Sequence, residues 1–228
     1  MEYVMDLSEN TIQVLKNFAS INSNIVIKNG KNISTISEAK NILASVDVEE
    51  EFNQEIGIYD LNEFLGVLGL VDKPRLKLNE DHAVIGDSSG RSKIRYYFSD
   101  KEMLTSPTKP VNMPVADVKF HLDNDTLNKI KRAASALGHT ELSITPGDGV
   151  VTLTVTSSDN STANSFSIDV VGESQADKYN FIFNIANLKM LSGHYDVEIS
   201  SKLISQFKNT DNSLKYWIAL EKNSKYGE

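Results

Sequence analysis

Cysteine is absent from this 228-residue sequence. Its absence excludes a disulfide scaffold, thiolate metal sites and a cysteine nucleophile, and it fits a reducing cytosol. No apolar run approaches the roughly 20 residues that a membrane-spanning helix needs, so we expect no membrane partner. The acidic N-terminus "MEYVMDLSEN" lacks the charged-then-apolar order of a signal peptide.

Positive charge is also in short supply. The chain has 23 Lys and Arg residues against 31 Asp and Glu residues, which gives a formal net charge of −8. This balance argues against a protein that coats nucleic acid with its whole surface, but it leaves a local basic patch open. Hydrophobic residues make up 40% of the chain, enough for a real core.

Recognisable catalytic and metal-binding patterns are missing as well. The four histidines are scattered, and the chain has no HExxH, calcium-loop or GxSxG motif. "PGDGVV" leads into a β-rich run and not into a helix, so it predicts a hairpin turn. The acidic cluster "VEEEF" at 48–52 is expected to be a solvated edge or loop. We therefore expect no enzyme activity, no metal and no cofactor.

The first half of the chain predicts a helix, short strands, a second helix and further strands. The first helix starts near Ser8, capped either by Ser8 or by an Asp6–Glu9 capping box. An Asn29-Gly30 pair predicts a tight hairpin, and Asp60 begins the second, short helix. The expected apolar stripe of the first helix consists of Ile12, Leu15 and Ala19, with Phe18 beside them.

Three of the five prolines lie close together at the middle of the chain. Proline fixes φ and has no N–H donor, so this stretch is predicted to be neither helix nor central strand. We expect an extended linker at 107–116 that joins an N-terminal domain at 1–106 to a C-terminal domain at 117–228. The three prolines are Pro107, Pro110 and Pro114.

The second half repeats the order of the first. Asp123 is expected to cap a long helix that Gly138 ends, and Asn184 to cap a short helix that Gly193 ends. The fold class is therefore α+β, with two similar domains of β-sheets and two helices each. The apolar stripe expected in the long helix is Leu127, Ile130, Ala134 and Leu137.

The long helix carries the stretch "TLNKIKRAASALGH", residues 126–139, which is basic and has no carboxylate. Lys129 and Arg132 are predicted to share its exposed face, with Lys131 beside them. An ordinary solvated helix face is the alternative, although such faces usually mix charges of both signs. Lys16 and Lys189 are expected on other helices of the two halves.

Several stretches resemble the DNA polymerase sliding clamp of T-even-like bacteriophages. The resemblance runs from about Leu7 to Glu221 in the same order and with similar spacing. It departs from the family pattern around 49–55 and 84–106. The stretches that carry it are "LKNFASINSNIVIKNG", "IYDLNEFLGVLGLV", "KPVNMPVA", "FIFNIANLKMLSGHY" and "WIALE".

The resemblance implies a DNA clamp fold and a homotrimeric ring of six domains, with helices lining a hole around duplex DNA. It implies a replicative DNA polymerase, an ATP-dependent clamp loader, and a late-transcription sigma factor and co-activator as partners. The location would be the cytoplasm of the infected bacterial host. The residues expected to face DNA, without reading its sequence, are Lys16, Lys129, Lys131, Arg132 and Lys189.

The resemblance also implies a pocket on each subunit for short hydrophobic C-terminal peptides of these partners. We expect Val111, Met113 and Pro114 to contribute to it, and plain packing between domains is the alternative. For the whole protein, the alternative hypothesis is a non-enzymatic viral structural or assembly protein built of β-domains.

Overall fold

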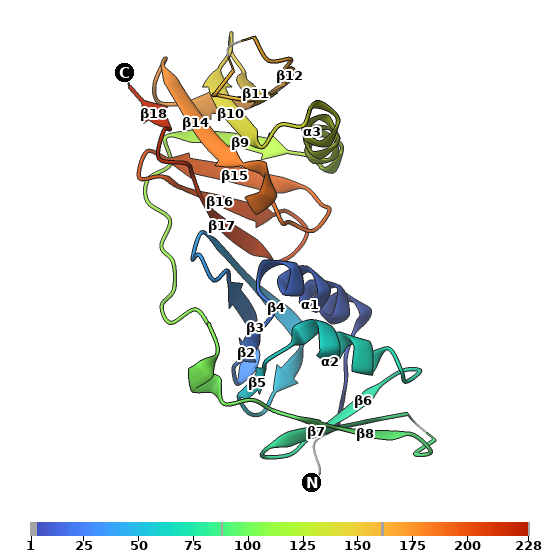
Figure 1. Ribbon diagram of the computed structural model, residues 1–228. Helices are drawn as coiled ribbons and strands as arrows, with labels where there is room; N and C mark the ends of the chain where they lie inside the picture. Colours follow the sequence, from blue (N-terminus) through green and yellow to red (C-terminus); the bar gives the residue numbers. More distant parts are fainter. Residues whose placement is uncertain (1–3, 88, 161, 228) are drawn as a thin grey trace. The chain divides into compact units, whose positions relative to one another are not determined.

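The computed structural model describes residues 4–87, 89–160 and 162–227 (Figure 1). The chain divides into two compact units, Met1–Lys109 and Pro110–Glu228. Each unit contains antiparallel β-sheets and helical segments, which confirms the α+β class. The boundaries at 1–106, 107–116 and 117–228 stay a prediction.

In unit 1, one antiparallel sheet has the strand order β1-β6-β7-β8. Successive side chains of a strand point to opposite faces. One face of the sheet is therefore apolar and buried, and the other carries mostly polar side chains that are exposed or half-buried. The four strands are β1 (Val4–Asp6), β6 (Arg75–Leu78), β7 (His82–Gly86) and β8 (Lys93–Tyr97).

The Asn29-Gly30 pair does not form the predicted hairpin. Strand β2 (Ile25–Ile27) pairs with β5 (Ile56–Ile58), and β3 (Gly30–Ile36) pairs with β4 (Ile42–Phe52). All three residues of β2 are buried, so burial of this apolar segment decides its partner over the local turn signal. The positive φ of Gly30, 111°, turns the chain between the two strand pairs.

Helix α1 (Glu9–Ile21) is capped by Ser8, and the Asp6–Glu9 alternative is wrong. The Ser8 Oγ accepts a hydrogen bond from the Thr11 N–H at 3.2 Å. Glu50 of β4 accepts two more, from the Ser8 N–H and, at 2.5 Å, from the Thr11 hydroxyl. Glu50 is only 9% exposed, so the expectation of a wholly solvated "VEEEF" is wrong. The helix N-terminus has free N–H groups, and the inward-pointing carboxylate of Glu50 satisfies one.

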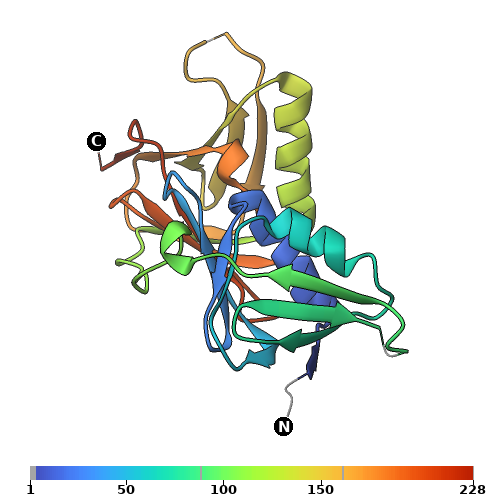
Figure 2. The same cartoon turned by 60° about the horizontal axis from the view of Figure 1, so that its bottom comes forward.

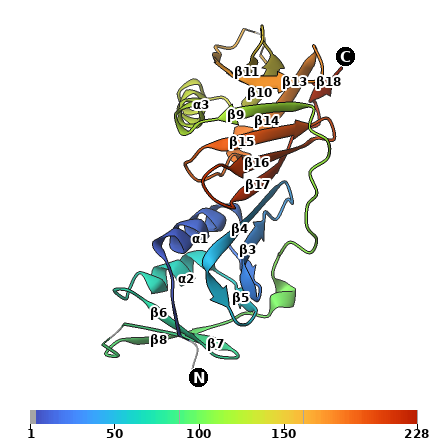
Figure 3. The same ribbon diagram turned by 180° about the vertical axis from the view of Figure 1, so that it is seen from behind.

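The buried stripe of α1 also differs from the prediction. Ile12 and Ala19 are half-buried, because they flank the stripe and do not lie on it. Helix α2 (Leu61–Leu68) lies beside α1 in all three views (Figures 1, 2 and 3). Asp60 caps α2 as predicted, and a 3₁₀ turn, η1 (Lys101–Met103), follows β8. The buried residues of α1 are Thr11, Val14, Leu15, Phe18 and Ile21.

Unit 2 contains two runs of antiparallel strands. The first has the order β12-β11-β10-β14-β18, with β12 (Phe166–Val170), β11 (Val151–Thr156), β10 (Glu141–Pro146), β14 (Tyr179–Asn184) and β18 (Lys225–Tyr226). The second has the order β13-β9-β15-β16-β17, with β13 (Gly172–Ser174), β9 (Val118–Leu122), β15 (Tyr195–Ser200), β16 (Ile204–Asn209) and β17 (Lys215–Ala219). The "PGDG" turn joins β10 to β11 as a hairpin, as predicted.

Candidate nucleic-acid interface

The basic stretch forms most of helix α3 (Asn124–Leu137), which is shown in yellow-green in Figure 2. The Asp123 carboxylate caps it by accepting hydrogen bonds from the Thr126 N–H, at 2.7 Å, and from the Thr126 hydroxyl, at 3.1 Å. These bonds lower the pKa of Asp123 and keep it ionised beside the positive end of the helix. Gly138 ends the helix in the left-handed conformation, at φ 69°.

Burial orients α3 much as its periodicity predicts. Leu127, Ile130 and Ala134 are buried together with Thr126, but Leu137 is only half-buried, because it lies in the last turn. The residues on the opposite side are therefore held toward solvent by packing.

The three cations of α3 differ in exposure. Lys129 and Arg132 are exposed, and Lys131 is half-buried, so its burial lowers the pKa of its amine. A shallow hollow of 480 Å³ runs along this surface. It is lined by Asp125, Asn128, Lys131, Arg132 and Ser135. The arrangement offers cations along a shallow, open surface, which suits an extended anion better than a small molecule.

A carboxylate that lies one residue before the quoted stretch changes its electrostatics. The Asp125 carboxylate forms an ion pair with the Lys129 ammonium, one helical turn away, at 2.6 Å. The acid-free stretch therefore begins directly after an acidic partner. The i, i+4 spacing is visible in the sequence, so this pair was within reach of sequence reasoning.

Lys16 lies on α1 of unit 1, where it is exposed. Its helix presents neutral polar neighbours, and Glu9 supplies an acidic side chain in the first turn. Unit 1 therefore contributes one candidate cation from its first helix, as the sequence indicates.

Lys189 does not lie on a helix, contrary to the prediction. Only the 3₁₀ turn η2 (Ile185–Asn187) forms, and Lys189 follows it as an exposed residue between buried Leu188 and Met190. Two tyrosine hydroxyls take up the backbone groups that a longer helix would use. Tyr216 accepts from the Leu191 N–H at 3.2 Å, and Tyr195 donates to the Leu191 carbonyl at 2.7 Å.

The fold also brings together two histidines that are far apart in the sequence. The rings of His121 and His194 stack at 5.9 Å, and His121 lies 3.2 Å from the Asp196 carboxylate. Among residues 4–87, 89–160 and 162–227, no three potential ligands converge on a metal position. Within the same ranges, no helix has the length and apolar character to cross a membrane.

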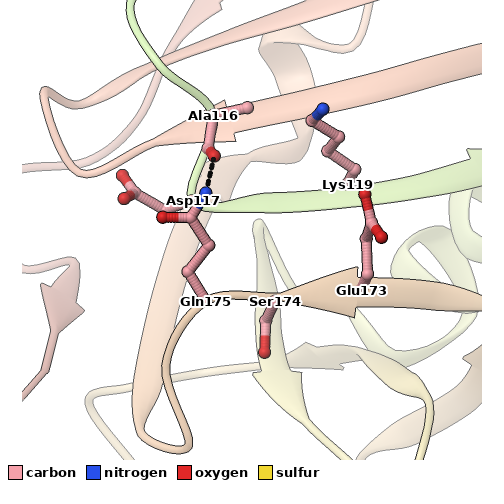
Figure 4. Close-up of a pocket in the computed structure, with 6 residues that line it drawn as sticks. All are labelled: Ala116, Asp117, Lys119, Glu173, Ser174 and Gln175. Atoms are coloured by element: carbon pink, nitrogen blue, oxygen red, sulfur yellow. Dashed lines mark hydrogen bonds between the residues drawn. The ribbon is translucent and has the colours of Figure 1, made fainter.

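A second hollow lies where the linker enters unit 2 (Figure 4). The Gln175 side chain donates to the Ala116 carbonyl at 3.3 Å, and Lys119 lies opposite Glu173 in the strand register. Its volume of 170 Å³ is below the roughly 300 Å³ of ordinary small-molecule sites, so we assign it no ligand. Upstream in the linker, Val111, Met113 and Pro114 are half-buried, and their role as a peptide pocket stays a prediction.

Comparisons with known proteins give this geometry a context. A family profile described as "DNA polymerase processivity factor" matches residues 8–104, and one described as "gp45 sliding clamp, C terminal" matches residues 119–222. The chain belongs to the phage sliding-clamp family. This membership confirms the resemblance seen in the sequence and disfavours the alternative of a virion structural protein.

Similar sliding clamps cover nearly the whole chain. That of Vibrio phage KVP40 is 33% identical over 95% of this chain and 99% of its own length. The sliding clamp of Escherichia phage RB69 is 31% identical over 96% of this chain and 98% of its own length. The sliding clamp of Enterobacteria phage T4 is 30% identical over 96% of this chain and 98% of its own length.

Solved structures of low sequence identity have the same fold. The proliferating cellular nuclear antigen of Entamoeba histolytica aligns with a TM-score of 0.67 at 16% identity, covering 92% of this chain and 94% of its own. A PCNA2-PCNA3 complex from Sulfolobus tokodaii aligns with a TM-score of 0.66 at 14% identity, covering 97% of this chain and 99% of its own. The expected DNA clamp fold is thus confirmed.

Proposed function

We propose that three copies of this protein close a ring around duplex DNA and tether a DNA polymerase to its template. The observation that carries this proposal is membership of the sliding-clamp family over both units. The ring itself performs no chemistry, and an ATP-dependent clamp loader opens and closes it. Its place of action is the cytoplasm of the infected bacterium.

The exposed surface of α3 supports a loose, sequence-independent hold on DNA. Phosphate contacts position a protein on DNA without reading bases, which suits a ring that must pass over any sequence. Five candidates per subunit become fifteen in a ring of three: Lys16, Lys129, Lys131, Arg132 and Lys189. Direct contacts would make binding steeply salt-dependent, and closure of the ring would weaken that dependence because retention becomes topological.

Unpaired strand edges support assembly of the ring. Strand β8 ends the four-stranded sheet of unit 1, and β12 ends a run of strands in unit 2. An exposed edge presents free N–H and C=O groups that can pair with another chain. We infer that these edges join neighbouring copies into the homotrimer.

Partner proteins would bind through short hydrophobic C-terminal peptides near Val111, Met113 and Pro114. The partners proposed are the polymerase, the clamp loader, and a late-transcription sigma factor with its co-activator. Substitution of Met113 by Asp should weaken binding of such a peptide and leave the ring intact, as measured by calorimetry and native mass spectrometry.

A topological experiment tests the central proposal. The protein is loaded onto nicked circular duplex DNA by its clamp loader, and the circle is then cut once. A ring should stay on the circle in high salt and leave the linear product through its ends. Equal retention on linear DNA with free ends rules out topological linkage, and a stable monomer or dimer at micromolar concentration by native mass spectrometry rules out the trimer.

A further inference from the structure

The solvent-facing side of the sheet β1-β6-β7-β8 carries an array of cations. Arg75 and Lys77 project from β6, and Lys93 and Arg95 from β8. The strand register joins them into two rows, Arg75–Gly86–Lys93 and Lys77–Val84–Arg95. We call the surface formed by Arg75, Lys77, Lys93 and Arg95 the basic sheet face.

The opposite side of the same strands belongs to the core. Leu76 and Ile85 are buried there, and Tyr96 packs edge-on against Phe64 of α2 at 5.1 Å. The basic sheet face therefore points away from α2 and from the core of unit 1.

Two carboxylates, Asp6 and Asp81, lie at the ends of these strands and next to the two rows of cations. Asp6 of β1 pairs with Arg75 at 3.2 Å, and Asp81, in the turn before β7, is held by His82 at 2.6 Å. The central strand β7 contributes Val84 and Gly86, which carry no charge. In a chain with a net charge of −8, a sheet face with four cations in two rows is not the average surface.

The corresponding strands of unit 2 show that the fold does not require this charge pattern. Their order, β9-β15-β16-β17, matches β1-β6-β7-β8. There, β15 supplies Asp196 and Glu198, and these carboxylates pair with His121 at 3.2 Å and with Lys208 at 3.3 Å. Cross-strand pairs of opposite charge balance the unit 2 face, as is usual for a solvated sheet.

An exposed aromatic ring lies beside the cations. Tyr97 is 59% exposed, and its ring lies 5.5 Å from the His82 ring at an angle of 44°. Arg95 donates a long hydrogen bond, 3.4 Å, to the Tyr97 hydroxyl. Cations that follow a backbone together with an aromatic ring that stacks on a base are the two elements of single-strand binding surfaces.

We propose that the basic sheet face binds single-stranded nucleic acid without sequence preference. The four cations contact phosphates, and Tyr97 stacks on one base. Alternate residues of a strand are about 7 Å apart, and strands two apart are about 10 Å apart, so the array is spread for an extended polyanion and not for one compact anion. An acidic polypeptide would use the cations but leave the aromatic ring without a role.

The test measures binding of a fluorescein-labelled oligothymidine to the full-length protein by anisotropy at several salt concentrations. The variant Lys93→Gln/Arg95→Gln is compared with Lys208→Gln/Lys215→Gln, which removes the same charge from the corresponding face of unit 2. Loss of two single-strand phosphate contacts should lower the slope of log K against log salt by about 1.4. The unit 2 control should keep the slope, and equal losses in both variants overturn the proposal.

The aromatic element separates nucleic acid from an acidic polypeptide. Tyr97→Ala should weaken oligothymidine binding about fivefold or more without changing the salt slope. Unchanged affinity of Tyr97→Ala, or displacement of the oligonucleotide by polyglutamate at equal charge, overturns the proposal in favour of an acidic protein partner. Native mass spectrometry and retention on circular duplex DNA are measured for each variant, so that weaker oligothymidine binding by an intact ring is distinguished from loss of the ring.

Discussion

Helices α1 and α3 open the two units in the same way, yet their exposed faces differ in charge. Each follows the first strand of its unit and has a capped N-terminus, but α1 exposes Lys16 with Glu9 and neutral residues, whereas α3 exposes Lys129 and Arg132. The sheets reverse this relation, because the basic sheet face belongs to unit 1 and its unit 2 counterpart is balanced. Two units that share the strand order of one sheet thus place their positive charge on different layers, so charge is set by side chains and not by topology.

The largest effect should come from reversing charge on α3. Lys129→Glu/Arg132→Glu should reduce the amount of protein loaded onto circular DNA by at least about tenfold, since each lost phosphate contact acts in every subunit. The experiment measures the amount of protein recovered in clamp–DNA complexes at low salt, and native mass spectrometry verifies that each variant is a trimer.

Two controls sharpen this comparison. Lys16→Glu on α1 should reduce loading onto circular DNA less than Lys129→Glu does. Lys208→Glu/Lys215→Glu on a sheet of unit 2 should leave loading unchanged. Equal losses on α1 and α3 would show that the two helices contribute alike and that the inferred asymmetry does not matter for DNA.

Next in size is the anchoring of the two helix N-termini. The first turn of α1 is held by Ser8 and by Glu50 of β4, whereas Asp123 caps α3 locally. Glu50→Ala should lower the free energy of unfolding by about 1–3 kcal/mol, because buried donors lose their partner. Asp123→Ala should cost about 1 kcal/mol. Urea unfolding measures both, and amide hydrogen exchange should locate the loss in α1 and α3 respectively.

Acidification should probe the same two carboxylates. Burial alone would raise the pKa of Glu50, but hydrogen bonds from Ser8 and Thr11 outweigh it and hold the pKa below 4.5. The Thr126 N–H likewise holds the pKa of Asp123 below 3.8. Both folded-state pKa values are lowered, so the stabilisation is complete above these ordinary values and is lost as pH falls through the folded values. Glu50→Gln should therefore flatten the acid side of the stability profile, and an unchanged profile would contradict this role.

The smallest effect concerns Asp125. Releasing Lys129 from its ion pair by Asp125→Asn should tighten DNA binding about twofold per subunit, since exposed i, i+4 pairs are weak. The change should vanish when Lys129 is already Gln, which a double-mutant cycle detects. A persistent gain in that background would mean that Asp125 repels DNA directly.

Much of the fold could be predicted from local sequence. The caps at Ser8, Asp60 and Asp123 and the end of α3 at Gly138 rest on hydrogen bonds that span only two to five residues. Failures came where a distant partner overrode a local signal. The apolar β2 pairs with β5 and not across Asn29-Gly30, and the short helix expected around Lys189 is replaced by contacts to Tyr195 and Tyr216.

The candidate surfaces likewise include one that local sequence predicted and one that it did not. Helical periodicity was enough to place Lys129 and Arg132 on an exposed face, because both lie on one regular helix. The basic sheet face was not foreseen, although "RLKL" and "KIRYY" each show cations at alternate positions. Alternation marks one side of a strand, but it does not say which other strand lies beside it.

The sequence by itself determined the family, the order of elements and the local ends of the helices, because each of these depends on residues near one another in the chain or on a pattern along it. Three placements depend on the tertiary structure alone. Glu50 points toward the start of α1, Lys189 lies outside a helix, and Lys77 and Arg95 lie in one row across Val84. Those outcomes depend on pairings between segments far apart in sequence, where burial and strand register outweigh local preference.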